Sequence, residues 1–301
     1  MRKIKVKTVD AFTLTPNTGN PAGVVLDASE LSTVMMQKIA REINLSETAF
    51  VCKPTKSDAD IQLRWFTPTT EVDLCGHATI ATFHALAQDG LLGMKDVGEY
   101  NFKIETASGI LPVEVIKETG RITIWFGLKH PVIDQGVQPK VEMIRVLDIN
   151  PGEFENRAAD VCDKNLYVQV KRLHTLFNMK PNFTTMSYFL SSRNLEGICV
   201  YATETVERDS KVHSRFFAPT IGINEDPVTG SAHGPLAYLL YENGYLEHAE
   251  TFYEFQGEQG DVIGRKGRVR VQIEISGHKV TSVRIGGNAI TVMEGEMQIH
   301  E

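Results

Sequence analysis

Three titratable side chains in or near expected loops could carry acid/base chemistry on a small molecule. They are Glu47, where a loop leads into a β-forming stretch, and His77 and Asp226, in loops that contain Gly or Pro. The apolar neighbours of Glu47 would desolvate its carboxyl group and raise its pKa, as a general acid/base requires. The spacing alone, however, favours an ordinary exposed glutamate at a strand end. Asp226, which precedes Pro227, could also be a turn former, and Ser231 a helix cap.

Two segments with related sequences, 64–90 and 215–244, contain His77 and Asp226, respectively. Each begins with an Arg-aromatic-Phe run and a Pro-containing loop, passes a glycine at Gly76 or Gly230, and ends in an apolar stretch before a second glycine. The pattern predicts in both a strand, a loop and a helix. Both helices are weakly polar on nearly all sides, which is typical of buried helices. We infer that half of the chain has been used twice.

The starts of these two helices suit an anion. The first N–H groups of a helix have no partner within it, and they lie at the positive end of the helix dipole. The repeat predicts that the Cys75–His77 and Thr229–Ser231 loops face each other across a cleft between two domains, where ligands commonly bind. We therefore expect a small carboxylate to bind there.

Composition excludes several classes of protein. A chain of 301 residues with 42% hydrophobic content can fill two domains, and a net charge of −7 without a Lys/Arg run argues against a general binder of nucleic acid or membrane surfaces. The start, 1–9, alternates basic and apolar residues, so we expect a strand and no signal peptide. No apolar run is long enough to span a membrane. Four dispersed cysteines without a CxxC pair favour reduced thiols in a cytoplasm.

Other chemistries are poorly supported. Ser231 close to His233 invites a serine hydrolase, but the G-x-S-x-G motif requires a glycine where Thr229 stands. Cys75 and His77 could begin a metal site, but no second ligand cluster has suitable spacing, so we expect no metal. Neither a dinucleotide fingerprint nor a phosphate loop follows an expected strand, so we also expect no cofactor.

The rest of the chain alternates helical and strand patterns. A helix is expected over Ser32–Ile43 with Val34 on its inward face, and antiparallel strands fill 102–126. The stretch 129–139 lacks periodicity and is the expected linker. No assignment is made for 172–193. Three strands, 268–275, 279–285 and 289–293, are expected to end the chain, separated at Gly277 and at Gly286-Gly287.

The chain resembles the PhzF-like phenazine-biosynthesis isomerases, and behind them the diaminopimelate epimerase and proline racemase superfamily, over nearly its whole length. The resemblance is carried by ordered motifs: Asp10-Ala11-Phe12, Gly19-Asn20-Pro21-Ala22-Gly23-Val24, Leu45-Ser46-Glu47-Thr48-Ala49-Phe50, Arg64-Trp65-Phe66-Thr67-Pro68, Asp73-Leu74-Cys75-Gly76-His77-Ala78-Thr79, Phe217-Ala218-Pro219, Glu225-Asp226-Pro227-Val228-Thr229-Gly230-Ser231-Ala232, Gln256-Gly257, Ile263-Gly264-Arg265 and Gly286-Gly287.

This resemblance implies an α+β fold of two pseudo-symmetric domains, each a β-barrel-like sheet wrapped around a central helix. Residues 1–128 would form the first domain and 129–287 the second, with a C-terminal strand, 288–301, returning to the first. The active site would lie between the domains, and the protein would commonly be a homodimer.

The resemblance also implies the chemistry of the site. Glu47 matches the family's acid/base glutamate, and His77, Asp226 and Ser231 match polar residues around the substrate. The reaction moves a hydrogen within a small cyclic, amino-acid-like carboxylate, as in the isomerisation of trans-2,3-dihydro-3-hydroxyanthranilate, without a cofactor. The expected substrate-binding residues are Asn20, Cys75, Gly76, Thr229 and Gly230.

Two alternatives stay open. The superfamily's racemases use one cysteine from each domain, but here Cys75 fills the first position and Thr229 the second, and a hydroxyl is far less acidic than a thiol of pKa ~8.5. The two-thiol mechanism of a cofactor-independent amino-acid epimerase or racemase is therefore disfavoured. A small-molecule-binding relative without turnover is also possible, although holding a ligand would not require the carboxyl groups of Glu47 and Asp226.

Overall fold

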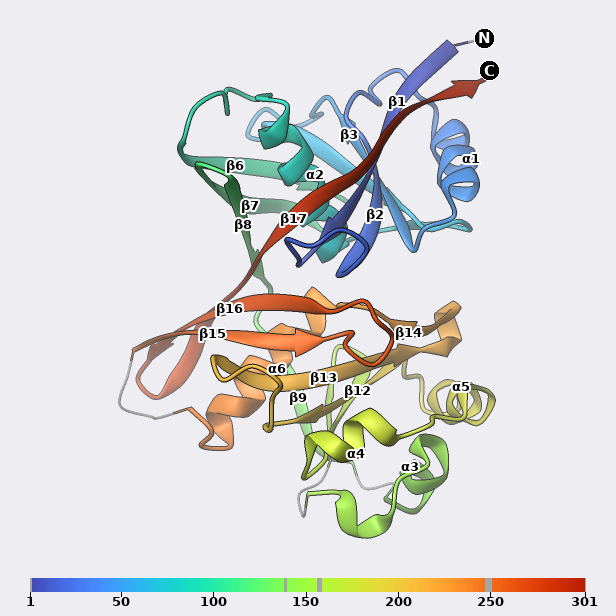
Figure 1. The fold of residues 1–301 in the computed structure, drawn as a ribbon, viewed down its shortest axis with the longest axis vertical. Coiled ribbons are helices and arrows are strands. Elements are labelled where there is room, and N and C mark those ends of the chain that lie inside the picture. Colours follow the sequence, from blue (N-terminus) through green and yellow to red (C-terminus); the bar gives the residue numbers. More distant parts are fainter. Residues whose placement is uncertain (1, 138–139, 156–158, 247–250, 301) are drawn as a thin grey trace. The chain divides into compact units, whose positions relative to one another are not determined.

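The computed structural model describes residues 2–137, 140–155, 159–246 and 251–300. The chain folds into two compact units (Figure 1). Unit 1 comprises Met1–Gly127 and Ile285–Glu301, and unit 2 comprises Leu128–Arg284. Both units are mixed α+β structures.

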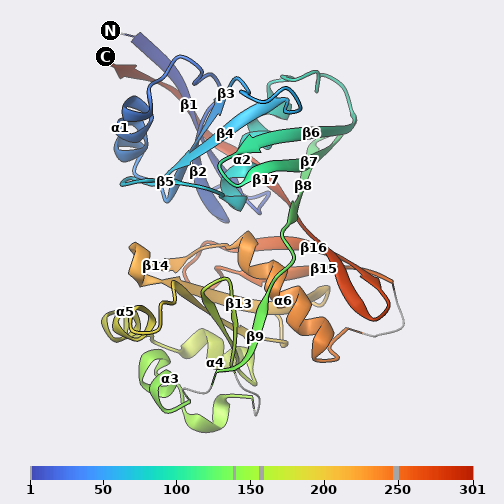
Figure 2. The ribbon, with the colours of Figure 1, turned by 180° about the vertical axis from the view of Figure 1, so that it is seen from behind.

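Unit 1 is a barrel-like sheet that surrounds one helix (Figure 2). Neighbouring strands pair in a ring, which closes because β17 pairs with β1 on one side and with β8 on the other. The strands of the ring are β1 (Arg2–Ala11), β2 (Asn20–Val25), β3 (Glu47–Cys52), β4 (Ile61–Phe66), β6 (Gly98–Thr106), β7 (Gly109–Glu118), β8 (Arg121–Leu128) and β17 (Lys279–Ile299), and β5 (Glu71–Val72) pairs with β4.

The enclosed helix is α2 (Gly76–Gln88), which packs against β1, β2, β3 and β7. Nearly every side chain from His77 to Ala87 is buried, as expected of a helix that is apolar on nearly all sides. The start of α2 is thereby fixed within the barrel, together with the residues that precede it.

Helix α1 (Thr33–Ile43) packs on unit 1 through one face only. Ser32 caps its N-terminus by accepting a hydrogen bond from the N–H of Met35 at 3.2 Å. Met35 and Ile39 are buried, whereas Val34 is 65% exposed. The prediction that Val34 faces inward was wrong, because the buried face starts one position later along the helix.

Unit 2 repeats the strand pairing of unit 1. β11 pairs in parallel with β12, β12 antiparallel with β13, β13 in parallel with β15, and β15 antiparallel with β16. In unit 1 the same order of pairings links β2, β3, β4, β6 and β7. The strands of unit 2 are β9 (Ile133–Val137), β10 (Ala159–Cys162), β11 (Asn165–Gln169), β12 (Gly197–Ala202), β13 (Ser210–Ala218), β14 (Ile223–Asp226), β15 (Phe252–Gln259) and β16 (Gly267–Ser276).

The helices of unit 2 include a counterpart of α2. This helix, α6 (Gly230–Glu242), has 13 residues like α2, is buried over most of its length and packs against β16. The internal repeat expected from the sequence is thus present in both the strand pairing and the helix. The other helices are α3 (Lys140–Leu147), α4 (Leu173–Asn178), α5 (Phe183–Ser191) and the 3-10 helices η1 (Pro151–Glu153) and η2 (Pro219–Ile221).

Gly286 and Gly287 do not separate two strands, as we expected, but lie inside β17, a single strand of 21 residues. A Cβ atom on Gly286 would lie 2.4 Å from the ring of Trp125, and one on Gly287 would lie 2.6 Å from the ring of Phe12. Glycine is needed here because aromatic rings press against the backbone, and not because the chain turns.

Two further stretches differ from the expectation. The unassigned stretch 172–193 contains α4 and α5. The expected linker, 129–139, contains β9, which pairs with β10, and its residues 138–139 lie outside the described residues. Among the residues that the structure describes, no helix is long and apolar enough to cross a membrane.

Candidate active site

Glu47 is the first residue of β3 and follows a sharp end of α1. The helix stops at Asn44, which adopts a left-handed conformation (φ 53°) and donates its N–H to the carbonyl of Ala40 at 3.0 Å. Asparagine tolerates this conformation better than most residues. Only Leu45 and Ser46 then precede the strand. The side chain of Glu47 is 13% exposed, so it is not the exposed strand-end glutamate that the spacing alone favours.

Cys75 and His77 reach Glu47 from the start of α2. Cys75 is the N-cap residue, but its side chain makes no capping hydrogen bond, and its Sγ lies 3.5 Å from Nδ1 of His77. Nε2 of His77 lies 3.3 Å from Oε2 of Glu47 and 3.4 Å from Oγ of Ser46. The contact with Glu47 is at ion-pair distance without hydrogen-bond geometry. The structure thus brings Glu47, Cys75 and His77 together, and it adds Ser46.

The surroundings of Glu47 change its acidity. Burial raises the pKa of Glu47, and hydrogen bonds from Ser46 and Cys75 lower it by less. A carboxyl group with a raised pKa is partly protonated closer to neutral pH, so it can both take up and return a proton.

The same group contains one ligand atom of each kind that zinc accepts. An oxygen of Glu47, the sulfur of Cys75 and a nitrogen of His77 lie within 4.8 Å of one another. The sequence spacing did not reveal Glu47 as a ligand beside Cys75 and His77, because β3 and α2 become neighbours only in the folded barrel.

Two more predicted residues of unit 1 are buried in its barrel. Asn20 is the first residue of β2, opposite Ala11 of β1, and it is 0% exposed. At the start of α2, a Cβ atom on Gly76 would lie 3.0 Å from the ring of Phe126. The start of α2 therefore packs tightly against β8.

In unit 2, Asp226 and Thr229 are joined through Gln259. Thr229 is the N-cap residue of α6, and its Oγ1 donates to the carboxylate of Asp226. Gln259 donates from Nε2 to the carbonyl of Asp226 at 2.8 Å, and its Oε1 accepts from the N–H of Thr229 at 3.1 Å. Gly230 and Ser231 form the first turn of α6, with Ser231 exposed.

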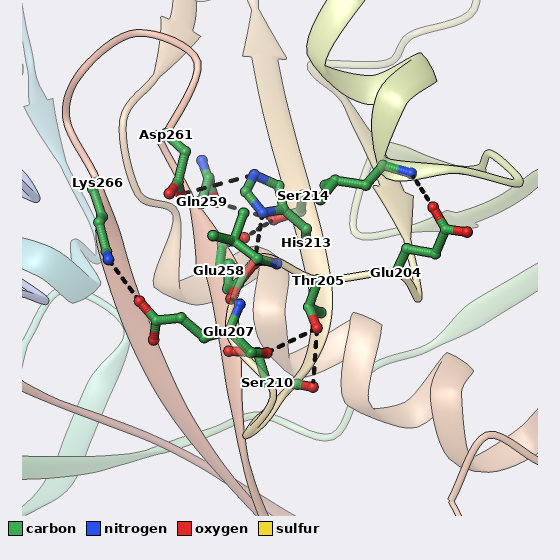
Figure 3. Close-up of polar contacts among 12 residues, drawn as sticks. Glu204, Thr205, Glu207, Ser210, His213, Ser214, Glu258, Gln259, Asp261 and Lys266 are labelled. Carbon is green, nitrogen blue, oxygen red and sulfur yellow. Dashed lines mark hydrogen bonds and ion pairs between the residues drawn. The ribbon is translucent and has the colours of Figure 1, made fainter.

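Gln259 was not predicted as a site residue from the sequence. Its position two residues after the Gln256-Gly257 motif is the signal that could have identified it. A buried polar network holds it (Figure 3). β13 pairs with β15 so that His213 lies opposite Glu258 and Ser214 lies opposite Gln259. Ser214 donates from Oγ to Oε1 of Gln259 at 3.4 Å, and Nδ1 of His213 lies 2.8 Å from Oε2 of Glu258.

Glu258 anchors this network as a buried anion. It accepts hydrogen bonds from the N–H groups of Val206 at 2.8 Å and Glu207 at 2.7 Å. Burial opposes the charge, but the hydrogen bonds from His213 and from these two N–H groups hold the pKa of Glu258 at about 2. The end of β15, and with it Gln259, is therefore fixed beside the start of α6.

His233 does not pair with Ser231. The imidazole is 0% exposed, and its Nδ1 lies 2.9 Å from the carbonyl of Thr229. Burial lowers the pKa of His233 to about 4, so the ring is neutral and Nδ1–H donates to Thr229. A Cβ atom on Gly257 would lie 2.3 Å from the ring. This arrangement agrees with the rejection of a serine hydrolase.

These features define a class of protein, in which a barrel-like sheet surrounds a helix and a buried carboxyl group of raised pKa lies beside an imidazole and a thiol. Proteins of this class are equipped for acid/base chemistry. The model of the PhzC-PhzF family, described as phenazine biosynthesis-like protein, matches residues 9–295, and the chain belongs to this family.

Several full-length relatives are named as isomerases. An uncharacterized isomerase of Clostridium acetobutylicum is 37% identical, with 100% of both chains covered. The trans-2,3-dihydro-3-hydroxyanthranilate isomerase of Pseudomonas chlororaphis is 30% identical, with 95% of this chain and 96% of that protein covered. The crystal structure of a PhzF-family phenazine biosynthesis protein from Bacillus anthracis is 33% identical and covers 99% of this chain and 100% of its own, with a TM-score of 0.88. The chain is thus an isomerase of the PhzF family, as the motifs indicated.

A more distant likeness is confined to the fold. A hydroxyproline epimerase from Agrobacterium vitis is 12% identical, covers 99% of this chain and 91% of its own, and has a TM-score of 0.64. This likeness shows that the chain shares its fold with that epimerase.

Proposed function

We propose that this chain moves a hydrogen within a small cyclic or amino-acid-like carboxylate, with Glu47 as the single general acid/base and without a cofactor. The observation that carries the proposal is the environment of Glu47, whose buried carboxyl group has a raised pKa and lies 3.3 Å from His77. The named reaction of the relative from Pseudomonas chlororaphis, isomerisation of trans-2,3-dihydro-3-hydroxyanthranilate, supplies the substrate class.

The proposed reaction uses one carboxyl group twice. Ionised Glu47 removes a proton from a carbon next to a conjugated system, and the electrons of that C–H bond enter the system. Protonated Glu47 then returns the proton to a second carbon on the same face, which restores the carboxylate. Atoms and electrons balance without an oxidant, a reductant or a second base.

Other residues are proposed to bind and orient the substrate. His77, Asp226 and Ser231 position the substrate and its mobile proton. Backbone N–H groups at the helix starts bind its carboxylate, in charge-assisted hydrogen bonds that contribute roughly 1.5–3 kcal/mol each. The remaining proposed contacts come from Asn20, Cys75, Gly76, Thr229 and Gly230.

An epimerase is the second candidate, and one observation favours it. Sγ of Cys75 lies 3.5 Å from an imidazole nitrogen of His77, an arrangement that can activate a thiol. Against it, the position in unit 2 that corresponds to Cys75 holds Thr229, whose hydroxyl donates to the carboxylate of Asp226. A relative that binds a small carboxylate without turnover is the third candidate.

Deuterium uptake separates the three candidates. Dihydro-hydroxyanthranilate and a panel of cyclic and aromatic amino acids are incubated with the protein in D₂O and followed by absorbance, mass and optical rotation. An isomerase changes the absorbance spectrum, whereas an epimerase inverts a stereocentre as deuterium enters it. Binding of a panel member without either change would reject the proposed activity. Size-exclusion chromatography with light scattering tests the homodimer that we also propose.

A further inference from the structure

Glu47, Cys75 and His77 have the geometry of a metal site as well as that of an acid/base site. Nε2 of His77 lies 3.3 Å from Oε2 of Glu47 and 4.0 Å from Sγ of Cys75. All three ligand atoms lie within 4.8 Å of one another. A tetrahedral zinc ion with ligand bonds of ~2.0–2.3 Å separates neighbouring ligand atoms by roughly 3.3–3.8 Å. The largest separation, at most 4.8 Å, exceeds this range by roughly an ångström, so small side-chain rotations would bring the three ligand atoms around one ion.

The chemistry of the three ligands selects zinc. A thiolate, an imidazole and a carboxylate are the ligands that Zn²⁺ accepts, whereas Mg²⁺ and Ca²⁺ prefer oxygen atoms alone. Three protein ligands leave a fourth position open. The side chains of His77 and Glu47 are 8% and 13% exposed, and Cys75 is 7% exposed, so the ion would be partly desolvated among ligands that β3 and α2 already hold in place.

We propose that Glu47, Cys75 and His77 bind one Zn²⁺ ion per chain, and that the bound ion inhibits the enzyme reversibly. Binding converts the Cys75 thiol into a zinc-bound thiolate, and the displaced proton passes to the buffer. The carboxylate of Glu47 then shares its electron pair with the metal and no longer accepts a proton from carbon. The inhibition rests on the proposed function, whereas the binding of zinc does not depend on it.

The binding test uses the whole chain, freed of metal, with Co²⁺ as a spectroscopic probe and Zn²⁺ in competition with a chelating dye. A cobalt–thiolate bond produces a charge-transfer band in the near ultraviolet, which the wild-type protein should show at one metal per chain. Cys75→Ser should lose this band. His77→Gln should keep the band, because the thiol remains, but bind more weakly. Changes in partners of metal ligands already weaken binding 10–100-fold, so loss of a ligand should cost at least roughly that factor.

Cys52→Ser is the matched control, because Cys52 is a second buried thiol of unit 1 and belongs to β3. It should keep both the band and the affinity of the wild-type protein. Circular dichroism of each variant establishes that it is folded. Wild-type protein that binds no Co²⁺ or Zn²⁺ stoichiometrically, or a folded Cys75→Ser variant that binds both ions as the wild type does, would overturn the metal site.

The inhibition test is separate. With a substrate that the enzyme turns over, Zn²⁺ should abolish turnover at one ion per chain, and EDTA should restore it. Stoichiometric binding without inhibition would overturn the inhibitory role and keep the site. If no substrate in the panel is turned over, the proposed function fails, and the cobalt spectrum still decides the metal site.

Discussion

Glu258 occupies in unit 2 the position that Glu105 occupies in unit 1. Glu105 accepts hydrogen bonds from the N–H groups of Thr55 and Lys56, and Glu258 accepts them from the N–H groups of the equivalent loop residues Val206 and Glu207. The strand residue opposite each glutamate also donates to it, through Gln62 at 3.2 Å in unit 1 and through His213 at 2.8 Å in unit 2. The repeat therefore includes the buried carboxylates of Glu105 and Glu258, each of which binds the backbone of a loop in its own unit.

Glu258→Gln should destabilise unit 2. The substitution removes a buried negative charge that hydrogen bonds hold at a pKa of about 2, and the expected loss of unfolding free energy is about 2–4 kcal/mol. Because this pKa is lower than the unfolded value of about 4.3, the stabilisation is complete above that value and is lost as the pH falls toward about 2. Urea unfolding at pH 7 measures the loss. Glu274→Gln, at an exposed position of β16, should change the stability by less than ~0.5 kcal/mol, and an equal effect of both variants would contradict the argument.

As the pH is lowered, the free energy of unfolding should begin to fall at pH values well above those at which carboxylates become protonated. Burial lowers the pKa of both His84 and His233 to about 4, helped by the charge of Lys7 at His84. Since the unfolded pKa is about 6.5, each neutral histidine stabilises the fold above that pH, and the stabilisation falls between about 6.5 and 4 by ~1.4 kcal/mol per pH unit for each histidine.

Urea unfolding at several pH values between 7 and 4.5 measures this slope. His84→Asn should reduce it, whereas His278→Asn, at an exposed turn, should not. A slope that is the same in all three proteins would show that His84 does not contribute.

Gly286→Ala should destabilise unit 1, because the new Cβ atom would meet the ring of Trp125 at 2.4 Å. Overpacking of this kind costs about 1–3 kcal/mol. Gly295→Ala lies in the same strand, and its Cβ atom would find no described atom within 4 Å, so it should be neutral. Thermal unfolding of the two variants compares them directly, and equal melting temperatures would mean that Trp125 moves away at no cost.

The sequence predicts what depends on local pattern. Both halves of the repeat, the helices that start at Gly76 and Gly230, and the family motifs could be found from residue order alone. The turn expected at Gly286 was wrong, because the reason for this glycine is the ring of Trp125, far away in sequence.

In the candidate site, too, the sequence predicts the residues of local motifs but not the contacts between distant parts of the chain. Glu47 was identified by its motif, and its apolar neighbours suggested desolvation, but its spacing alone favoured an exposed position. His77 of α2 becomes its neighbour only in the folded barrel. Gln259 was missed for the same reason. Its contacts with Asp226 and Thr229 exist only because β15 ends beside the start of α6.

Glu47→Gln should abolish most of the turnover and leave ligand binding nearly unchanged. Glutamine keeps the size and most of the hydrogen bonds of Glu47 but cannot carry the proton, and general acid/base catalysis contributes about 10²–10⁴-fold. Asp226→Asn should weaken binding and turnover together, since Asp226 is proposed to position the substrate. In the wild type, kcat/KM should fall as the pH drops through a value above the ordinary pKa of a glutamate, because burial raises the pKa of Glu47 and only its ionised form accepts the proton. Stopped-flow absorbance and deuterium uptake with the best substrate of the panel measure these effects. If Cys75→Ser abolished proton exchange while Glu47→Gln did not affect it, the base would be the thiol, and the epimerase would replace the isomerase as the function of this site.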